Sequence, residues 1–189
     1  TVVVSRSGYT GEDGFEVVVR PEAAAGFWDR LTADARVRPI GLGARDSLRL
    51  EAGLPLYGHD LDETTSPVEG GLRFAVSKRR REARDFPGAE RILTEWAGGP
   101  SRVRVGLRVT GAPAREGAEI ADASGAVVGR VTSGGPAPTA GGAVAMGYIP
   151  PRLAEPGTPL HVIVRGRPQP AEVVPLPFVP HRYVRKPVR

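Results

Sequence analysis

The chain has 189 residues, with 26 lysine and arginine residues against 21 aspartate and glutamate residues, a formal net charge of +5. Its 40% hydrophobic and 25% charged residues are typical of a globular protein with one large domain or two small ones. The absence of cysteine excludes disulfides, thiolate metal sites and a cysteine nucleophile, and no apolar run approaches the roughly 20 residues that span a membrane.

The stretch at residues 8–16, GYTGEDGFE, combines three glycines with three carboxylates and then enters an apolar run. Glycine tolerates positive φ angles and lets another backbone approach closely. The pattern therefore predicts a glycine-shaped loop that joins strands at residues 1–5 and 16–19. Glu16 lies inside the second strand, where a buried carboxylate needs an internal cation or a ligand that offers N–H donors.

Two amphipathic helices are predicted next. Pro21 suits the first turn of a helix, and apolar residues at four-residue spacing predict a helix over residues 23–36. Residues 41–53, GLGARDSLRLEAG, predict a second helix that ends at Gly53. Because this second helix has apolar side chains on two sides, we expect it to pack between two layers.

The second helix also carries the charges of interest. Asp46 lies three residues before Arg49 and can form an ion pair with it. Arg45 has no comparable partner on its own helix, so it is the less explained cation. One interpretation pairs Arg45 with Glu16 in a buried ion pair, and the other directs both side chains to a ligand.

The segment after the second helix is polar. In residues 54–66, His59, Asp60 and Asp62 resemble a metal cluster only superficially, and we expect them to be solvated or to cap the next element. Apolar residues at period two predict a strand over residues 67–77.

Two further patterns precede the second half of the chain. Residues 78–81 are four consecutive cations, which are typical of a solvated face. The DFPG sequence at residues 85–88 predicts the start of a helix that continues through Trp96.

A composition break at residues 98–100, Gly-Gly-Pro, separates this mixed part from a β-rich part. Residues 102–109 alternate strictly between cationic or small and apolar side chains, which predicts a half-buried strand. Five later strands are expected at residues 119–122, 126–133, 143–149, 160–164 and 172–175. Six short strands at this spacing favour a small antiparallel barrel or sandwich, and the fold class is α+β.

The positive charge has two explanations, a generally basic surface or an anionic partner. Nucleic acid is weakly supported as that partner, because only 6% of the residues are aromatic and no nucleic-acid motif is present. We expect no membrane partner.

Several of these stretches together resemble one family, the aminomethyltransferases (T-proteins) of the glycine cleavage system. The resemblance covers essentially the whole chain, follows the order of that family's C-terminal half and favours its mitochondrial-type members. It is carried by GYTGEDGFE, GLGARDSLRLEAGLPLYGHDLDETTSPVEGGL, SKRRR, DFPGAERIL, VTSGGPAPT, AMGYIP and PFVPHRY.

The resemblance implies tetrahydrofolate as co-substrate, bound in the central hole of a three-domain, cloverleaf-like fold, and no metal. It implies that the lipoylated H-protein delivers an aminomethyl group, and that ammonia, methylene-tetrahydrofolate and reduced lipoyl are released. The location it implies is the mitochondrial matrix in a eukaryote and the cytoplasm in a bacterium. By motif match, the expected folate-binding residues are Glu16, Arg45, Tyr183 and Tyr9.

The chemistry of these side chains suits a pterin. The pterin edge offers an amine beside a ring N–H, and the Glu16 carboxylate can accept from both. The Arg45 guanidinium is a rigid donor fork for a carbonyl or a carboxylate, and Tyr183 offers a ring face and one hydroxyl. Without the resemblance, Tyr183 is an ordinary tail aromatic and Tyr9 is a packing residue beside a turn.

The chain begins Thr-Val-Val-Val without a methionine, so we expect a fragment or a processed product of a longer chain. We expect residues 1–93 to be the C-terminal portion of the folate-binding core, incomplete and unstable alone, and residues 94–189 to form the barrel domain. The aspartate that the resemblance places beside the reactive nitrogen has no counterpart here, so we expect the isolated chain to be inactive and to bind folate weakly. The alternatives are a folate-dependent demethylase module of a flavoprotein and a truncated, non-catalytic binding module.

Overall fold

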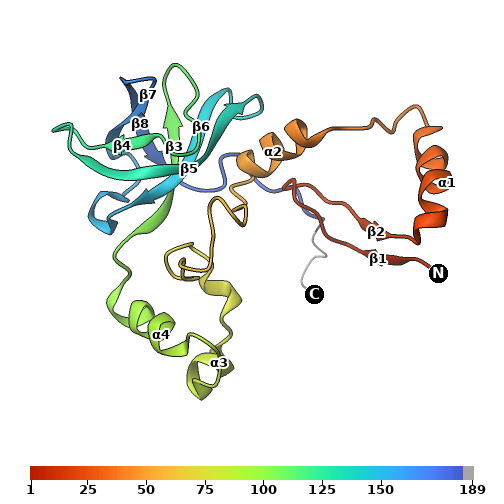
Figure 1. Ribbon diagram of the computed structural model, residues 1–189, viewed down its shortest axis with the longest axis horizontal. Coiled ribbons are helices and arrows are strands. Elements are labelled where there is room, and N and C mark those ends of the chain that lie inside the picture. The colour runs from red at the N-terminus through yellow and green to blue at the C-terminus, as the bar shows by residue number, and fades with distance from the viewer. Residues whose placement is uncertain (185–189) are drawn as a thin grey trace.

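The structure, a computed structural model, describes residues 1–184 and has three parts (Figure 1). A six-stranded barrel forms the second half of the chain, a small helical segment lies beside it, and an N-terminal arm extends away from it. Helix α2 (Leu42–Glu51) connects the arm to the barrel. No helix among the described residues is long and apolar enough to cross a membrane.

The arm contains the predicted strand pair and first helix. β1 (Val3–Ser5) and β2 (Glu16–Val18) pair antiparallel, with Ser5 opposite Glu16. Helix α1 (Pro21–Thr32) begins with proline, as predicted. It ends at Thr32 rather than residue 36, because the Asp34 carboxylate accepts from the backbone N–H of Arg36 at 2.9 Å and forms a turn there.

The expectation that Glu16 is buried is wrong. All three residues of β2 are exposed, and so are all three residues of β1. Within the described residues these strands pair only with each other, and the residues of both strands are exposed. Glu16 therefore requires no internal cation.

Helix α2 is the link between the arm and the barrel. It ends where predicted, and Gly53 follows it with a φ of 65°. The expectation that it packs between two layers is wrong: Leu50 is 2% exposed against the barrel, but Leu42 at the other end is 82% exposed. Only the last turn is buried, where Leu50 contacts an apolar cluster that includes Met146.

The strand predicted over residues 67–77 is also wrong. Gly70 N–H donates to Ser66 O at 3.0 Å, and Gly71 has a φ of 71°, so the chain turns instead of extending. A 3-10 helix, η1 (Arg73–Ala75), follows. Two helices complete this segment, α3 (Lys78–Ala83) and α4 (Ala89–Gly98), and the start of α4 agrees with the prediction.

The six predicted strands of the second half are confirmed, and they close into an antiparallel barrel in the order β3-β6-β5-β4-β7-β8. Closure removes the unpaired edges of an open sheet. A short 3-10 helix, η2 (Pro151–Leu153), joins β6 to β7. The strands are β3 (Val103–Val109), β4 (Glu119–Ala121), β5 (Val127–Ala137), β6 (Gly142–Ile149), β7 (Pro159–Val164) and β8 (Arg167–Val174).

Alternating apolar side chains of these strands fill the barrel. Leu107, Ile120, Val131, Leu160 and Val162 are each at most 1% exposed and belong to one cluster. The barrel is therefore a packed core and a rigid support for the loops around it. The domain division expected at residue 93 lies within α4 and stays a prediction.

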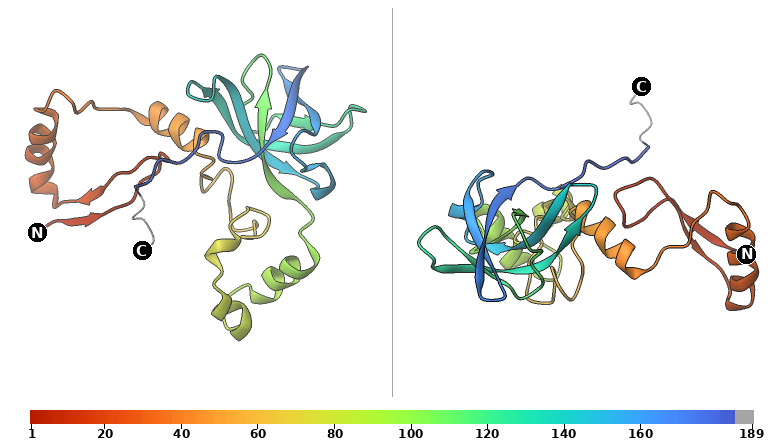
Figure 2. Two further views of the ribbon diagram at one scale, coloured as in Figure 1. Left: turned by 180° about the vertical axis from the view of Figure 1, so that it is seen from behind. Right: turned by 90° about the horizontal axis from the view of Figure 1, so that it is seen from above.

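After β8 the chain returns to the arm (Figure 2). Val179 N–H donates to Glu51 O at 2.9 Å at the end of α2, and Arg182 N–H donates to Gly11 O at 2.8 Å. The C-terminal segment thus fastens the 8–16 loop to α2, although the three are far apart in sequence.

Candidate functional site

The 8–16 loop is held between α2 and the C-terminal segment. Gly11 is buried and has a φ of 75°, and a Cβ at this position would lie 2.8 Å from Ala52 Cβ and 3.2 Å from His181 Cδ2. His181 Nε2 lies 2.8 Å from Ala52 O, at the end of α2. Only glycine permits this approach, which explains why the loop needs a glycine here.

Tyr9 and Arg45 are brought together by this arrangement. The Arg45 guanidinium carbon lies 4.7 Å from the centre of the Tyr9 ring, a cation–π contact. The Tyr9 hydroxyl donates to Pro55 O, and burial raises the pKa of that phenol above its ordinary value. The Tyr9 ring therefore packs against the exposed Arg45 guanidinium, while the Tyr9 hydroxyl is already hydrogen-bonded to Pro55 O.

Glu16 lies at the base of the same loop. Its carboxylate accepts a hydrogen bond from the Ser7 hydroxyl and is otherwise exposed. Within residues 1–184 no ion pair joins Glu16 to Arg45, so the buried ion pair considered from the sequence is not formed. The carboxylate keeps acceptor capacity for a ligand.

Tyr183 lies beside the same loop. Its ring centre is 5.0 Å from that of His181, with an angle of 49° between the planes. Beside it, Arg182 Nη1 lies 3.7 Å from Glu12 Oε1 and the two residues form an isolated β-bridge. A hollow of about 350 Å³ is lined by Tyr183 together with Ser7, Gly8 and Gly14 of the loop and the Arg6–Asp13 ion pair.

The structure thus groups the four expected residues around one loop, but in two sets. Tyr9 contacts Arg45 of α2, while Tyr183 lines the hollow next to Ser7. Glu16 is connected to that hollow through Ser7. Among the described residues, no hydrogen bond, ion pair or ring contact joins one set to the other.

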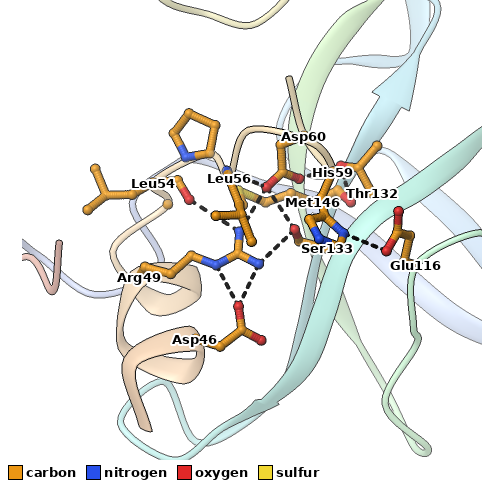
Figure 3. Close-up of polar contacts among 12 residues, drawn as sticks. Asp46, Arg49, Leu54, Leu56, His59, Asp60, Glu116, Thr132, Ser133 and Met146 are labelled. Carbon is orange, nitrogen blue, oxygen red and sulfur yellow. Dashed lines mark hydrogen bonds and ion pairs between the residues drawn. The ribbon is translucent and has the colours of Figure 1, made fainter. Parts of the chain in front are cut away.

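A buried polar network lies next to this site, and sequence reasoning found only one of its pairs (Figure 3). The predicted Asp46–Arg49 pair is confirmed at 2.7 Å. Arg49 Nη1 also lies 2.8 Å from Asp60 Oδ2, and Arg49 Nη2 donates to Ser133 at 2.9 Å. Asp60 in turn accepts from the Leu56 N–H at 2.9 Å.

His59, Asp60 and Asp62, which resembled a metal cluster in the sequence, each bind a different partner. Asp60 belongs to the buried network, Asp62 accepts from the Thr64 hydroxyl at 2.8 Å, and His59 Nδ1 lies 2.6 Å from Glu116 Oε2. In the described part of the chain, no group of three or more histidine, aspartate or glutamate side chains could hold a metal ion.

Both halves of the chain match known families. Residues 1–80 match the GCVT N-terminal domain, and residues 102–180 match the glycine cleavage T-protein C-terminal barrel domain. The observed barrel, β3 to β8, lies entirely within the second of these matches.

Curated relatives and a solved structure cover nearly the whole chain. A probable mitochondrial aminomethyltransferase of Schizosaccharomyces pombe is 56% identical over 181 residues, which are 96% of this chain and 46% of the relative. The mitochondrial aminomethyltransferase of Gallus gallus is 51% identical over 184 residues, 97% of this chain and 47% of the relative. The crystal structure of glycine cleavage system aminomethyltransferase T from Bartonella henselae has a TM-score of 0.94 and 45% identity, over 97% of this chain and 51% of that chain.

The chain spans about half the length of the curated relatives it matches. The sequence similarity, the two domain matches and the shared fold all agree along almost the full 189 residues. This chain belongs to the glycine cleavage T-protein family.

Proposed function

We propose that the chain serves an aminomethyltransferase of glycine cleavage. In this reaction the aminomethyl carbon passes from the lipoyl arm of H-protein to tetrahydrofolate, ammonia leaves, and methylene-tetrahydrofolate and reduced lipoyl remain. The observation that supports the proposal best is the grouping of Glu16, Arg45, Tyr9 and Tyr183 around one rigid loop.

Glu16 is assigned to the pterin edge. An exposed carboxylate with one oxygen held by Ser7 retains the acceptor capacity that an adjacent amine and ring N–H require. Charge-assisted hydrogen bonds of this kind are shorter and stronger than neutral ones. Glu16 would thereby fix the orientation of the ring system.

Arg45 and Tyr183 are assigned to the rest of the folate. The Tyr9 ring beneath the Arg45 guanidinium leaves its N–H edge available to a carbonyl or a carboxylate. Tyr183 lines the hollow and offers a ring face for stacking. Proton transfer to the departing amine needs a positioned acid, and we assign that role to none of these residues.

The proposed partners are tetrahydrofolate and the lipoylated H-protein. Both are anionic, and the basic runs at residues 78–81, 102–108 and 182–189 are candidates to attract them. Residues 185–189 of the last run lie outside the described part of the chain. In a eukaryotic source we place the protein in the mitochondrial matrix, in agreement with the names of the mitochondrial relatives, and in a bacterial source in the cytoplasm.

A chimera tests the proposal. The chain replaces the matching 181 residues of the Schizosaccharomyces pombe relative, which supplies the remaining part of that protein. We expect the chimera to form methylene-tetrahydrofolate and ammonia from aminomethyl-loaded H-protein, and the chain alone to be nearly inactive. A chimera that binds tetrahydrofolate without turnover would support the non-catalytic binding module instead.

The demethylase alternative has its own readout. In this test a methylated amine replaces loaded H-protein as the one-carbon donor. The mixture also contains tetrahydrofolate and a flavoprotein that oxidises the amine. If the chimera formed methylene-tetrahydrofolate from the methylated amine but not from loaded H-protein, the aminomethyltransferase assignment would be contradicted.

A further inference from the structure

Asp13 joins the end of β1 to the C-terminal segment at the hollow beside Tyr183. Arg6, which follows β1, donates to both of its oxygens: Nε lies 3.0 Å from Oδ1, and Nη2 lies 2.8 Å from Oδ2. The hydrogen bonds from Arg6 and, to a smaller extent, from the Val184 backbone hold the pKa of the Asp13 carboxyl below its ordinary value. One ionised carboxylate in the loop therefore contacts both of the other segments that line the hollow.

On the β1 side, the contact continues to Glu16. Ser7 follows Arg6 directly and donates its hydroxyl to the Glu16 carboxylate, and Ser5 pairs with Glu16 across the ribbon. An exposed glutamate otherwise samples several rotamers. Because Asp13 fixes Arg6, it also restricts Ser7, and Ser7 restricts the direction of the Glu16 carboxylate.

On the other side, the contact continues to Tyr183. This residue lies between two that are fastened to the loop: Arg182 N–H donates to Gly11 O at 2.8 Å, and Val184 contacts Asp13. The Tyr183 ring itself is 37% exposed. Its place beside the hollow therefore depends on these two backbone attachments more than on burial of the ring.

The Arg6–Asp13 pair differs from an ordinary surface ion pair in its geometry. Exposed pairs usually contribute little to stability. This pair is bidentate, and two parallel hydrogen bonds fix the direction of both side chains. The neighbouring Arg182–Glu12 pair, by comparison, has a single contact of 3.7 Å. We therefore expect the Arg6–Asp13 pair to act on local geometry more than on the stability of the fold.

We propose that Asp13 is a positioning residue that sets the separation between Glu16 and Tyr183 across this hollow. The inference rests on the proposed function, since these two side chains are proposed contacts of the folate. Asp13 acts through its neighbours on either side and is assigned no contact with the reacting atoms. A ligand held between a carboxylate and a ring binds more tightly when their spacing is fixed before it arrives.

Tetrahydrofolate binding tests the inference, by calorimetric titration of the chimera described above, which contains this chain intact. Asp13→Ala should weaken binding roughly tenfold, about the value of one well-placed hydrogen bond to a charged group. Asp13→Asn should keep part of the affinity, because its amide oxygen can still accept from the Val184 backbone. Melting temperatures should stay nearly unchanged, since the side chain is at the surface; a loss of affinity that only accompanies a lower melting temperature would overturn the positioning role.

Asp34→Ala is the matched control. Asp34 forms a second exposed bidentate pair, with Arg36 Nη2 2.6 Å from its Oδ2, and it does not line the hollow. This variant removes the same charge from the same arm and should leave the affinity unchanged. If Asp34→Ala weakened binding as much as Asp13→Ala, the effect would be one of net charge, and the inference would be wrong.

A double-mutant cycle separates positioning from a direct contact between Arg6 and the ligand. If the pair acts as one unit, Arg6→Gln combined with Asp13→Ala should weaken binding about as much as either change alone. If Arg6 bound the ligand itself, Asp13→Ala would free its guanidinium and tighten binding. Tighter binding by Asp13→Ala, or fully additive losses, would each contradict the positioning role.

Hydrogen exchange gives a readout that needs no ligand. The Tyr183 and Val184 amides should exchange faster in the Asp13→Ala chimera than in the unmodified one, and unchanged exchange would overturn the inference. The failure of the proposed function looks different. If the unmodified chimera did not bind tetrahydrofolate, the folate assignment would be wrong and this inference with it; if it bound and Asp13→Ala bound equally well, only the role of Asp13 would be wrong.

Discussion

Arg49 Nη1 lies 2.8 Å from Asp60 Oδ2, and the two side chains are 4% and 0% exposed. Asp60 also accepts from Ser133 at 2.7 Å, and Tyr148 donates to its backbone oxygen at 2.7 Å. The carboxylate and the backbone oxygen of Asp60 therefore join α2 and the polar loop that follows it to two barrel strands, β5 and β6. This junction determines where α2 lies against the barrel, and hence where Arg45 lies.

The first prediction concerns this pair. Asp60→Asn should lower the free energy of unfolding by about 3–5 kcal/mol, because it removes the buried counter-charge of Arg49 and leaves only the exposed Asp46 carboxylate as its partner. Asp46→Asn is the control: that carboxylate is 55% exposed, and its loss should cost less than about 1 kcal/mol. Urea denaturation followed by circular dichroism measures both, and equal effects would contradict the buried role of Asp60.

The second prediction concerns the loop glycines. Gly11→Ala should lower stability by about 1–3 kcal/mol, since its φ is 75° and the new methyl group would lie 2.8 Å from Ala52 Cβ. Gly8→Ala is the matched control, with nothing within 4 Å of its Cβ position. Hydrogen exchange should be faster at the Arg182 amide in the first variant, because that amide donates to Gly11 O. An unchanged Arg182 amide would show that Gly11 does not fasten the C-terminal segment.

Local patterns predicted much of this fold. The alternation at residues 102–109 and the glycine and proline punctuation of the later strands predicted the barrel, since strand period and turn chemistry are local properties. The strand expected at residues 67–77 failed because the buried Ser66–Glu69 turn overrides the period-two pattern there. The partner that decides this turn, Arg102, is 33 residues away from Glu69.

The site was harder to predict for the same reason. The family motifs indicate Glu16, Arg45, Tyr9 and Tyr183 as candidates, and their role stays a prediction. The exposure of Glu16 depends on what covers β2, which no local pattern contains. Asp60 in a polar loop gave no sign of burial, because its partner Ser133 is 73 residues away. Long-range contacts of this kind are where sequence reasoning failed.

The third prediction concerns alkaline pH. Burial raises the pKa of Tyr148 to about 12, against about 10 in the unfolded chain. Because the pKa is higher in the folded state, the protonated phenol contributes to the free energy of unfolding. This contribution is fully present below pH 10 and is lost as the pH rises to 12. That loss should be about 3 kcal/mol at most.

Urea denaturation at pH 9 and pH 11.5 tests the Tyr148 effect. Tyr148→Phe should be less stable at pH 9, because it lacks the hydrogen bond to Asp60 O, but should lose less stability between the two pH values. Tyr57→Phe is the control, since Tyr57 is 67% exposed. A Tyr148→Phe variant with the same pH dependence as the unmodified chain would contradict the assignment.

The fourth prediction separates ligand binding from folding at Glu16. Glu16→Gln should weaken tetrahydrofolate binding by the chimera roughly 10- to 100-fold, the value of a charge-assisted hydrogen bond to the ring. It should leave the melting temperature nearly unchanged, because the carboxylate is exposed. Glu22→Gln in the first turn of α1 removes the same charge away from the loop and should change neither quantity. Equal affinity of the Glu16→Gln and unmodified chimeras for tetrahydrofolate would remove Glu16 from the proposed folate site.

The last prediction concerns the cationic face at residues 73–85, which has six lysine and arginine residues against two carboxylates. Several of these cations have internal contacts: Arg80 lies 2.8 Å from Asp85, Lys78 lies 3.7 Å from Glu82, and the Arg81 guanidinium lies 4.5 Å from the centre of the Trp96 ring. Arg79 and Arg84 are exposed and have no ion-pair partner in the described part of the chain. These two are therefore the cations most available to an acidic protein.

Reversal of these two charges tests attraction of the proposed H-protein partner. Arg79→Glu with Arg84→Glu should weaken H-protein binding by the chimera at low salt, and the difference should shrink as salt screens the interaction. Reversal at Arg80 or Arg81 would also break internal contacts, so those positions are avoided. Arg165→Glu with Arg167→Glu, two exposed positions at the turn between β7 and β8, changes the net charge by the same amount and is the control. If the double variant bound H-protein as tightly as this control at low salt, the face at residues 73–85 would have no part in recognising that partner.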